Sequence, residues 1–424
     1  MTPTSLPFAG NNSLNDIQKP ILKVLGLGGG GCNAVERMIE LGMSGVDFIA
    51  ANTDHQVLKN NLAPTKIHLG PKTTRGLGAG GDPRVGQAAA EESCREIAAA
   101  LQGADMVFLT AGMGGGTGTG SIPVAAEIAR SLGAVTIAIV TTPFSFEMGR
   151  RQRNATEGLN RLRQQTNTLI AIPNDRLLYI APRNLPMETA FRLADDVLRQ
   201  SVQGISELIT EPGLINVDFA HIRRLIRLGG GALMAIGQGH GPDKARMALD
   251  QALHHPLLDS VSLDRAAGVI ANFTGGNDLT LCEVEESLNH LQAQTGAETE
   301  IVMGVISNEC MNDRVQVILV ITGLGAPTLE EALSSVQRPS PAQQPASAPL
   351  AEALYPATPG LQAEPFPLSS QARAALAHPP AQPATPAPAA PAASTAAYPP
   401  DMAMNLDLPA FLRRRSRLAG GLGA

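Results

Sequence analysis

The chain has 424 residues and a formal net charge of −6 at pH 7. That charge excludes a protein that coats nucleic acid through a dense basic surface, whereas small anionic ligands remain compatible with it. The four cysteines are widely separated, and no segment has the pattern of a signal peptide or of a membrane helix of roughly 20 apolar residues, so we expect a cytoplasmic protein with free thiols.

The first half of the chain alternates short apolar runs with helical patterns. A buried run begins at Ile21 and ends in glycines, and residues 32–42 after it have helical spacing. Further apolar runs, separated by helical stretches, cover residues 46–54, 104–112, 134–143 and 167–175. This alternation predicts an α/β fold with a mostly parallel sheet that helices cover on both faces.

A long amphipathic helix and a second, smaller domain are predicted to follow. Apolar residues recur every three or four positions between residues 188 and 210, at Phe191, Ala194, Leu198, Val202, Ile205 and Ile209. Strand patterns then cover residues 231–239, 266–276, 301–307 and 314–324, and helical patterns cover 242–253 and 282–292. This order predicts a domain of α+β type joined to the first through the long helix.

The segment after the second domain is rich in proline and alanine. Sixteen of the 32 prolines fall between Pro339 and Pro400, where the charged residues are Glu352, Glu364 and Arg373. Such a segment has few apolar groups to bury and is predicted to be a disordered tether. We therefore divide the chain into an α/β domain (20–187), a linking helix (188–212), an α+β domain (213–326), a disordered linker (327–403) and a tail (404–424).

The first glycine cluster, Gly26 to Asn33, lies between a strand pattern and a helix pattern. Backbone N–H groups of such a turn, with the helix N-terminus, bind phosphate oxygens. The cluster also fits the GxGxxG fingerprint of dinucleotide-binding proteins, with Asp54 as the ribose-binding acid. A tight turn without a ligand is a third interpretation, and the cluster alone does not separate them.

A second glycine cluster, Met113 to Ser121, again follows an apolar run and precedes a helix pattern. Its glycines let the chain fold closely around an anion, and Thr117 and Thr119 add hydroxyl donors. A nicotinamide-dependent oxidoreductase has no use for a second loop of this kind, and the cluster lacks the lysine of a GxxxxGK[ST] phosphate loop. Both classes are therefore disfavoured, and a nucleotide held by two loops is favoured.

With this cluster the chain resembles the tubulin/FtsZ superfamily, in which GGGTGTG is the signature loop for the nucleotide phosphates. The likeness is to FtsZ, the bacterial cell-division homologue of tubulin, and extends from about Lys23 to Gly325 with a short C-terminal peptide. The blocks that carry it include GGGGCNAV (28–35), ANTD (51–54), GLGAGGDP (76–83), GGGTGTG (114–120), IPND (172–175), ADDVL (194–198) and DLPAFLRR (407–414). The resemblance implies a GTPase that polymerises head to tail at the division site, on the inner face of the membrane.

The resemblance also implies which residues bind GTP or GDP. They are Gly29, Gly30, Gly31, Cys32 and Asn33 in the first cluster, Gly80 in a third glycine loop, Gly115, Gly116, Thr117, Gly118, Thr119 and Gly120 in the second cluster, and Glu147, Arg151, Asn174 and Asp195. Mg²⁺ is expected to bind through the nucleotide phosphates and water, without a dedicated protein site.

Three of these residues, Glu147, Arg151 and Asp195, have alternatives when they are considered without the resemblance. Glu147 and Arg151, four residues apart at a helix start, flank the ribose and base in the family, but they also fit an exposed helical ion pair. Asn174 and Asp195 are the family's base-reading positions. A carboxylate suits guanine, whose N1–H and N2 amino group are both donors, so Asp195 favours GTP over ATP; its alternative is a solvated acid on the polar side of the long helix.

The third loop, residues 76–83, lies near the terminal phosphate in the family and responds to it. Its glycines are consistent with that role and equally with an ordinary surface loop.

The catalytic loop of the family follows the long helix and inserts into the nucleotide pocket of the next subunit, so that polymerisation completes the enzyme. Here it retains Asn216 and Asp218, but His221 stands where the family has a second aspartate. Imidazole has a reference pKa near 6.5, so it does not replace a carboxylate that holds a cation and orients water. His221 then acts as a general base toward water or as a hydrogen-bond donor to a phosphate oxygen; the alternative is that catalysis is weak and the loop is mainly an assembly contact. We expect slower GTP turnover than in a chain with both aspartates.

The tail regains a sequence pattern at residues 405–417, where an apolar ridge precedes several arginines. In the family this peptide docks on membrane-anchoring and regulatory division proteins, and it is predicted to order on binding. A solubilising basic end and contact with anionic lipid are the alternatives. For the whole protein, the alternative to a standard FtsZ is a catalytically impaired filament protein that copolymerises with one or regulates it.

Overall fold

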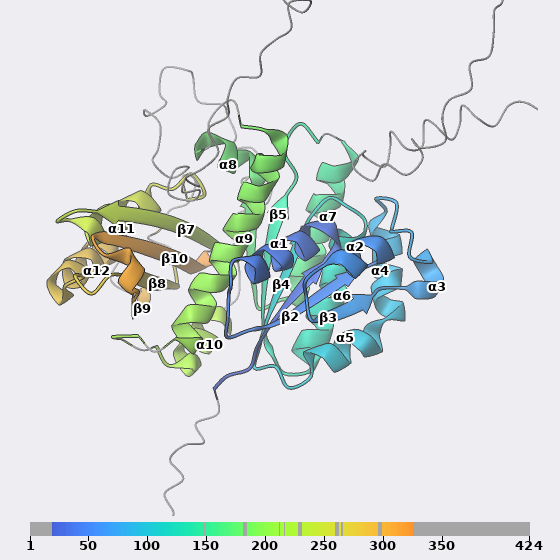
Figure 1. Cartoon of the computed structure of the whole chain (residues 1–424), viewed down its shortest axis with the longest axis horizontal. Helices are drawn as coiled ribbons and strands as arrows, with labels where there is room; N and C mark the ends of the chain where they lie inside the picture. Colours follow the sequence, from blue (N-terminus) through green and yellow to red (C-terminus); the bar gives the residue numbers. More distant parts are fainter. Residues whose placement is uncertain are drawn as a thin grey trace, which may run out of the picture. The chain divides into compact units, whose positions relative to one another are not determined.

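The computed structural model describes residues 19–147, 149–180, 185–211, 213–215, 217–227, 231–258, 263, 266–295 and 299–324 (Figure 1). The predicted linker and tail, and Asn216 of the catalytic loop, lie outside the described residues.

Ten strands form one sheet in the order β3-β2-β1-β4-β5-β6-β7-β10-β8-β9. The strands of the first half are β1 (Leu22–Leu27), β2 (Asp47–Asn52), β3 (Thr65–His68), β4 (Met106–Gly112), β5 (Val135–Thr142) and β6 (Thr168–Pro173), all parallel to their neighbours. The second half contains β7 (Gly231–His240), β8 (Gly268–Gly275), β9 (Glu300–Ser307) and β10 (Arg314–Leu324), with β10 antiparallel to both β7 and β8. The mostly parallel sheet with a second, smaller domain agrees with the predicted fold class.

The two halves of the sheet meet through a short pairing between β6 and β7, in which Leu169 lies opposite Gly231 and Ile170 opposite Ala232. Helix α9 (Met187–Thr210) adds a second connection, because it runs between the two sets of strands (Figure 1). The amide of Asn272 in β8 donates to the carbonyl of Gly204 at 3.2 Å, and a Cβ at Gly204 would lie 2.5 Å from Ile318 Cδ1 in β10. The middle of α9 is thus packed directly against the second half.

Helices cover both faces of the sheet, as the alternating sequence pattern predicts. The helices outside the second half are α1 (Gly28–Glu40), α2 (His55–Asn60), α3 (Pro71–Thr74), α4 (Pro83–Glu92), α5 (Cys94–Leu101), α6 (Thr117–Ser131), α7 (Arg150–Gln165) and α8 (Asn174–Ile180); α10 (Phe219–Arg227), α11 (Lys244–Leu253) and α12 (Leu281–Thr295) follow α9. One hydrophobic core lies between the sheet and helices α1, α9 and α10. A second lies between the sheet and the four helices α4, α5, α6 and α7, and a third packs α11 and α12 against strands β7 to β10.

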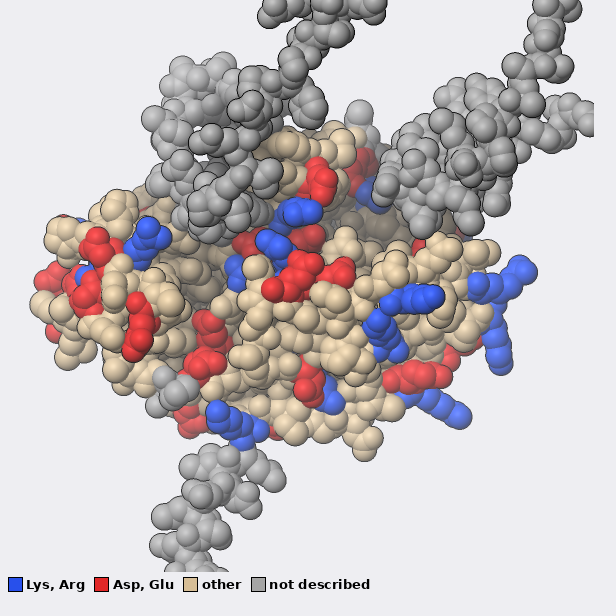
Figure 2. All heavy atoms as spheres, in the orientation of Figure 1, with Lys and Arg blue, Asp and Glu red and all other residues tan. Residues whose placement is uncertain are grey.

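Charged side chains are spread over the face that carries α1 and α9. Figure 2 shows acidic and basic side chains interspersed on this face, without a continuous field of one sign.

Candidate nucleotide-binding site

Loops that follow five neighbouring parallel strands meet at one edge of the sheet. Strands β2, β1, β4, β5 and β6 are adjacent and parallel, so their carboxyl ends lie side by side. The first glycine cluster follows β1, the second follows β4, the segment with Glu147 follows β5, and Asn174 begins α8 directly after β6. Predicted binding residues that lie far apart in the sequence are therefore gathered at this edge.

The first glycine cluster forms the opening turn of α1, four residues earlier than the helical pattern at Cys32 suggested. The helix begins after Leu27, which has no side chain that can cap it. Its first N–H groups therefore have no intrahelical acceptor and no side-chain cap, which makes this end a site for an anion. A Cβ at Gly31 would lie 2.3 Å from the carbonyl oxygen of Thr110, so the close packing of α1 on β4 requires glycine there.

Cys32 and Asn33 occupy different environments in that first turn. The Cys32 thiol is buried beside Asn52, and burial raises its pKa to about 12. It points into the core, so of Cys32 only the backbone N–H can serve a ligand. The side chain of Asn33 is exposed.

The second cluster opens α6, whose N-cap residue, Gly116, also provides no side-chain cap. The hydroxyl of Thr119 accepts a hydrogen bond from the Gly114 N–H at 2.8 Å, and the hydroxyls of Thr117 and Thr53 lie 2.6 Å apart. A Cβ at Gly28, where φ is +70°, would lie 2.7 Å from the Gly118 nitrogen. The two clusters are therefore in contact, and their uncapped helix ends open beside each other.

Two of the glycines have no structural reason within the protein to be glycine. A Cβ added at Gly29 or Gly115 would meet nothing within 4 Å, and neither residue has a left-handed φ. Glycine at such positions fits the close approach of a ligand to the backbone. Residues at both helix starts thus fit a bound polyphosphate.

The third glycine loop adopts left-handed backbone conformations at Gly76, Gly78, Gly80 and Gly81. A Cβ at Gly80 would meet nothing within 4 Å, so its glycine is required by its φ of +60° rather than by crowding. The Gly78 N–H donates to the Thr53 carbonyl at 3.2 Å. Because the hydroxyl of Thr53 also contacts Thr117 of the second cluster, this hydrogen bond fixes the start of the third loop beside that cluster.

Glu147 and Arg151 form the ion pair that their spacing suggested, but its members are unequally exposed. The Glu147 side chain is 9% exposed and the Arg151 side chain 57%. Glu147 also accepts the Phe144 N–H at 3.0 Å. The carboxylate is therefore fixed by the backbone, while the guanidinium of Arg151 keeps donors free for a ligand.

Asn174 is buried, and its side-chain oxygen has no hydrogen-bond partner among the residues that the structure describes. An unpaired buried acceptor is costly, typically by about 1–3 kcal/mol. A ligand N–H at this place would remove that cost, so the environment of Asn174 fits a base-reading amide.

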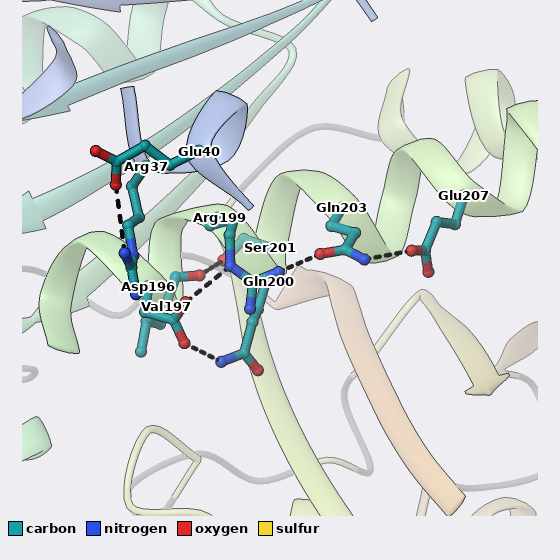
Figure 3. A network of polar contacts seen from close by, with 9 residues as sticks. All are labelled: Arg37, Glu40, Asp196, Val197, Arg199, Gln200, Ser201, Gln203 and Glu207. Carbon is teal, nitrogen blue, oxygen red and sulfur yellow. Dashed lines mark hydrogen bonds and ion pairs between the residues drawn. The ribbon is translucent and has the colours of Figure 1, made fainter. Parts of the chain in front are cut away.

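Asp195 in α9 is partly buried, which differs from a solvated acid on a polar helix face. Burial raises its pKa to about 7, while Arg37 of α1 acts in the opposite direction and Asp196 adds to the rise. The adjacent Asp196 is satisfied along its own helix, by Arg199 at 2.7 Å and Gln200 at 2.6 Å (Figure 3). Asp195 is therefore the less stabilised carboxylate of the two, and donors on a ligand would stabilise its charge.

An aromatic cluster near these residues was not singled out by the sequence analysis. Phe144 stacks on Phe146 with ring centroids 5.1 Å apart and meets Phe191 edge-on at 5.4 Å. Phe146 is 53% exposed and Phe191 is 38% exposed. Phe146 directly precedes Glu147 in the sequence, and Phe191 lies one helical turn before Asp195. The PFSF segment just before Glu147 was the available signal, since exposed aromatic rings provide faces for a base.

Comparisons with known proteins agree with this geometry. Residues 21–182 match the model of the tubulin/FtsZ family GTPase domain, and residues 230–325 match that of the FtsZ family C-terminal domain. The chain is 46% identical to FtsZ of M. jannaschii, solved as an empty dimer, over 73% of this chain and 90% of that one, with a TM-score of 0.70. The chain belongs to the tubulin/FtsZ family.

More distant members share the fold. CetZ2 from Haloferax volcanii, solved as a GTPγS-bound protofilament, is 19% identical over 75% of this chain and 97% of that one, with a TM-score of 0.65. CetZ1 from the same organism, a GDP-bound monomer, is also 19% identical, over 74% and 99%, with a TM-score of 0.63.

Two of the residues that were predicted to be catalytic, Asp218 and His221, lie at the start of α10. Asp218 caps α10, because its carboxylate accepts the Ala220 N–H at 2.9 Å, and His221 is exposed in the first turn. Asp195 and Thr210 are separated by 15 residues of α9, about 22 Å along the axis. Since α10 follows the far end of α9 (Figure 1), Asp218 and His221 come after the end of that helix that is farther from Asp195.

Arginines cover the solvent side of α10. Ile222, Leu225 and Ile226 are buried, whereas Arg223, Arg224 and Arg227 are exposed, and Arg224 pairs with Glu300 of β9.

Within the part of the chain that the structure describes, no three His, Cys, Asp or Glu side chains gather to hold a metal ion. No helix in the same residues is both long and apolar enough to cross a membrane.

Proposed function

We propose that this FtsZ-family chain binds GTP and GDP at the edge formed by its glycine loops and assembles head to tail. The observation that supports the proposal is the length of α9, because Asp218 and His221 follow the end of this helix that is farther from Asp195. A second copy must bring its catalytic loop to the nucleotide if hydrolysis is to occur there. The M. jannaschii relative is a dimer and the CetZ2 structure a protofilament, which supports such self-association.

The nucleotide is proposed to lie with its phosphates at the N-termini of α1 and α6 and its terminal phosphate beside Gly80. Uncapped N–H groups and the dipoles of both helices favour the negative charge. Mg²⁺ is held through phosphate oxygens and water, which suits a cation that keeps much of its hydration shell. Glu147 and Arg151 then lie by the ribose, and Phe146 and Phe191 provide apolar surface for the base.

Guanine specificity is proposed to come from Asp195 and Asn174. A charged Asp195 accepts hydrogen bonds from guanine N1–H and from its amino group, and the unpaired oxygen of Asn174 accepts one further donor. Adenine cannot donate from N1, so ATP is expected to bind poorly.

Replacing Asp195 with asparagine should remove a pH dependence of GDP binding. The pKa of Asp195 is about 7 in the nucleotide-free protein, and guanine needs the charged form, so parent affinity should rise between pH 6 and pH 8. Below pH 7 the carboxyl is protonated, and affinity should fall by up to about tenfold per pH unit. The ratio of parent to variant dissociation constants, measured by titration calorimetry at pH 6, 7 and 8, cancels the titration of the phosphates.

The same linkage predicts an effect on stability without nucleotide. The folded-state pKa of Asp195 lies above the unfolded value of 3.8, so the parent loses stability as pH rises from about 4 to 7. Asp195→Asn should therefore raise the melting temperature more at pH 8 than at pH 5. Asp47→Asn, at an exposed acid, is the control.

A parent-to-variant affinity ratio that is flat between pH 6 and pH 8 would contradict the assignment of Asp195 to guanine.

The division site on the inner face of the membrane is the proposed location, in keeping with membership of the FtsZ family. Membrane-anchoring and regulatory division proteins are the proposed partners of residues 405–417, which lie outside the described residues. The proposed boundaries of the functional parts remain 20–187 for nucleotide binding, 188–212 for the linking helix and 213–326 for the domain with the catalytic loop.

A second candidate function is an accessory filament protein that copolymerises with a standard FtsZ or regulates it. His221 in place of an aspartate favours it, because the loop then has one carboxylate fewer to position water. The two candidates differ in hydrolysis by the pure protein, not in nucleotide binding.

One experiment tests both. The purified full chain is mixed with GTP, GDP or a slowly hydrolysed GTP analogue, and light scattering and phosphate release are followed together. The leading proposal expects assembly both with GTP and with the analogue. Phosphate release in proportion to polymer is expected with GTP. Assembly without phosphate release would support the accessory protein, and no affinity for any guanine nucleotide would contradict both.

A further inference from the structure

The side chain of Asn154, in α7, connects two loops that are far apart in the sequence. Its amide nitrogen donates to the carbonyl oxygens of Gly81 and of Gly114, each at 3.2 Å. Gly81 belongs to the third glycine loop, and Gly114 opens the second cluster. One neutral amide therefore uses both of its N–H groups to join these two loops.

Further contacts along the same face of α7 hold the third loop and the helix that follows it. Arg150 lies 3.9 Å from Asp82, at the end of the loop, and Arg161 donates to Gln87 of α4 at 3.1 Å. Positions 150, 154 and 161 are spaced by four and seven residues, which places them on one side of the helix. These residues line a cavity of about 670 Å³ between α4 and α7.

The second cluster is pressed against the same helix. A Cβ at Gly114 would lie 2.8 Å from the carbonyl oxygen of Arg151, and φ at Gly114 is +98°. The position of Gly114 is thus fixed by α7, whereas Gly80 and Gly81 have open space around their Cα atoms. Because Asn154 donates to both Gly114 and Gly81, it holds this part of the third loop at a fixed place relative to the second cluster.

We infer that Asn154 is a positioning residue that lets the third glycine loop distinguish a triphosphate from a diphosphate. This inference rests on the proposed nucleotide site. A diphosphate is held by the helix starts of α1 and α6 alone, whereas a terminal phosphate also needs Gly80 and Gly81 in place. Asn154 holds these glycines before the ligand arrives, so their ordering does not oppose binding of the triphosphate.

Asn154→Ala tests the inference through the ratio of two affinities. The dissociation constants of GDP and of a slowly hydrolysed GTP analogue are measured for the full chain by titration calorimetry. We expect analogue affinity to fall about 5- to 10-fold, the low end of what two neutral hydrogen bonds contribute, with GDP affinity within about twofold of the parent. Asn154→Asp keeps the shape of the side chain but has no N–H donor, so it should lose at least as much.

Asn160→Ala is the matched control, because Asn160 is exposed on the same helix. It should change neither affinity. Equal losses of analogue and GDP affinity in Asn154→Ala would show a merely structural role, and unchanged affinities would show no role; both overturn the inference. A parent chain that binds neither ligand would instead contradict the nucleotide site itself.

Discussion

Replacing Gly115 with alanine is expected to weaken GTP binding about 10- to 100-fold without unfolding the protein. The added methyl group meets no protein atom within 4 Å, and the backbone of Gly115 is not left-handed, so the nucleotide-free fold should keep its stability. The methyl group would instead occupy space beside the uncapped start of α6, where the phosphates are proposed to lie. Titration calorimetry with GDP and a GTP analogue, together with thermal unfolding, measures both quantities.

Gly31→Ala is the contrasting variant, because its Cβ would lie 2.3 Å from the Thr110 carbonyl oxygen. A backbone oxygen cannot move aside without shifting β4, so we expect destabilisation of about 3 kcal/mol or more. Binding should be lost there together with the fold. If Gly115→Ala bound GTP as tightly as the parent, the phosphates would have to lie elsewhere.

The fold class and the two glycine loops that open helices can be predicted from the sequence because their signals are local. Each glycine cluster stands between an apolar run and a helical pattern, and each opens a helix in the structure. Strand β3 was not predicted, since Thr65–His68 is a short edge strand with a single buried residue, Ile67, and so has no apolar run. The start of α1 was placed late because helix propensity disfavours the glycines that form its first turn.

Features of the site that depend on contacts between residues far apart in the sequence could not be predicted from the sequence. Burial in the folded chain raises the pKa of Asp195, and Arg37, which acts in the opposite direction, lies on α1, far away in the sequence. Asn154 could not be found from any pattern, because its partners are backbone carbonyls 73 and 40 residues away.

Replacing His221 with aspartate is expected to raise GTP turnover per mass of polymer by about tenfold, the factor for a barrier lower by roughly 1.4 kcal/mol. His221 is exposed in the first turn of α10. Asp218 already uses one carboxylate oxygen to cap that helix, so it has less capacity left for water. An aspartate at 221 would restore a second carboxylate without disturbing the cap.

The measurement separates chemistry from assembly. Phosphate release is divided by sedimented polymer, since a carboxylate beside Arg223 and Arg224 changes the charge of the assembly surface as well. His240→Asp, at an exposed histidine of β7 outside the catalytic loop, controls for added negative charge and should leave turnover per polymer unchanged. Unchanged turnover in His221→Asp at equal polymer would mean that position 221 does not limit hydrolysis, because Asp218 keeps its place in both proteins.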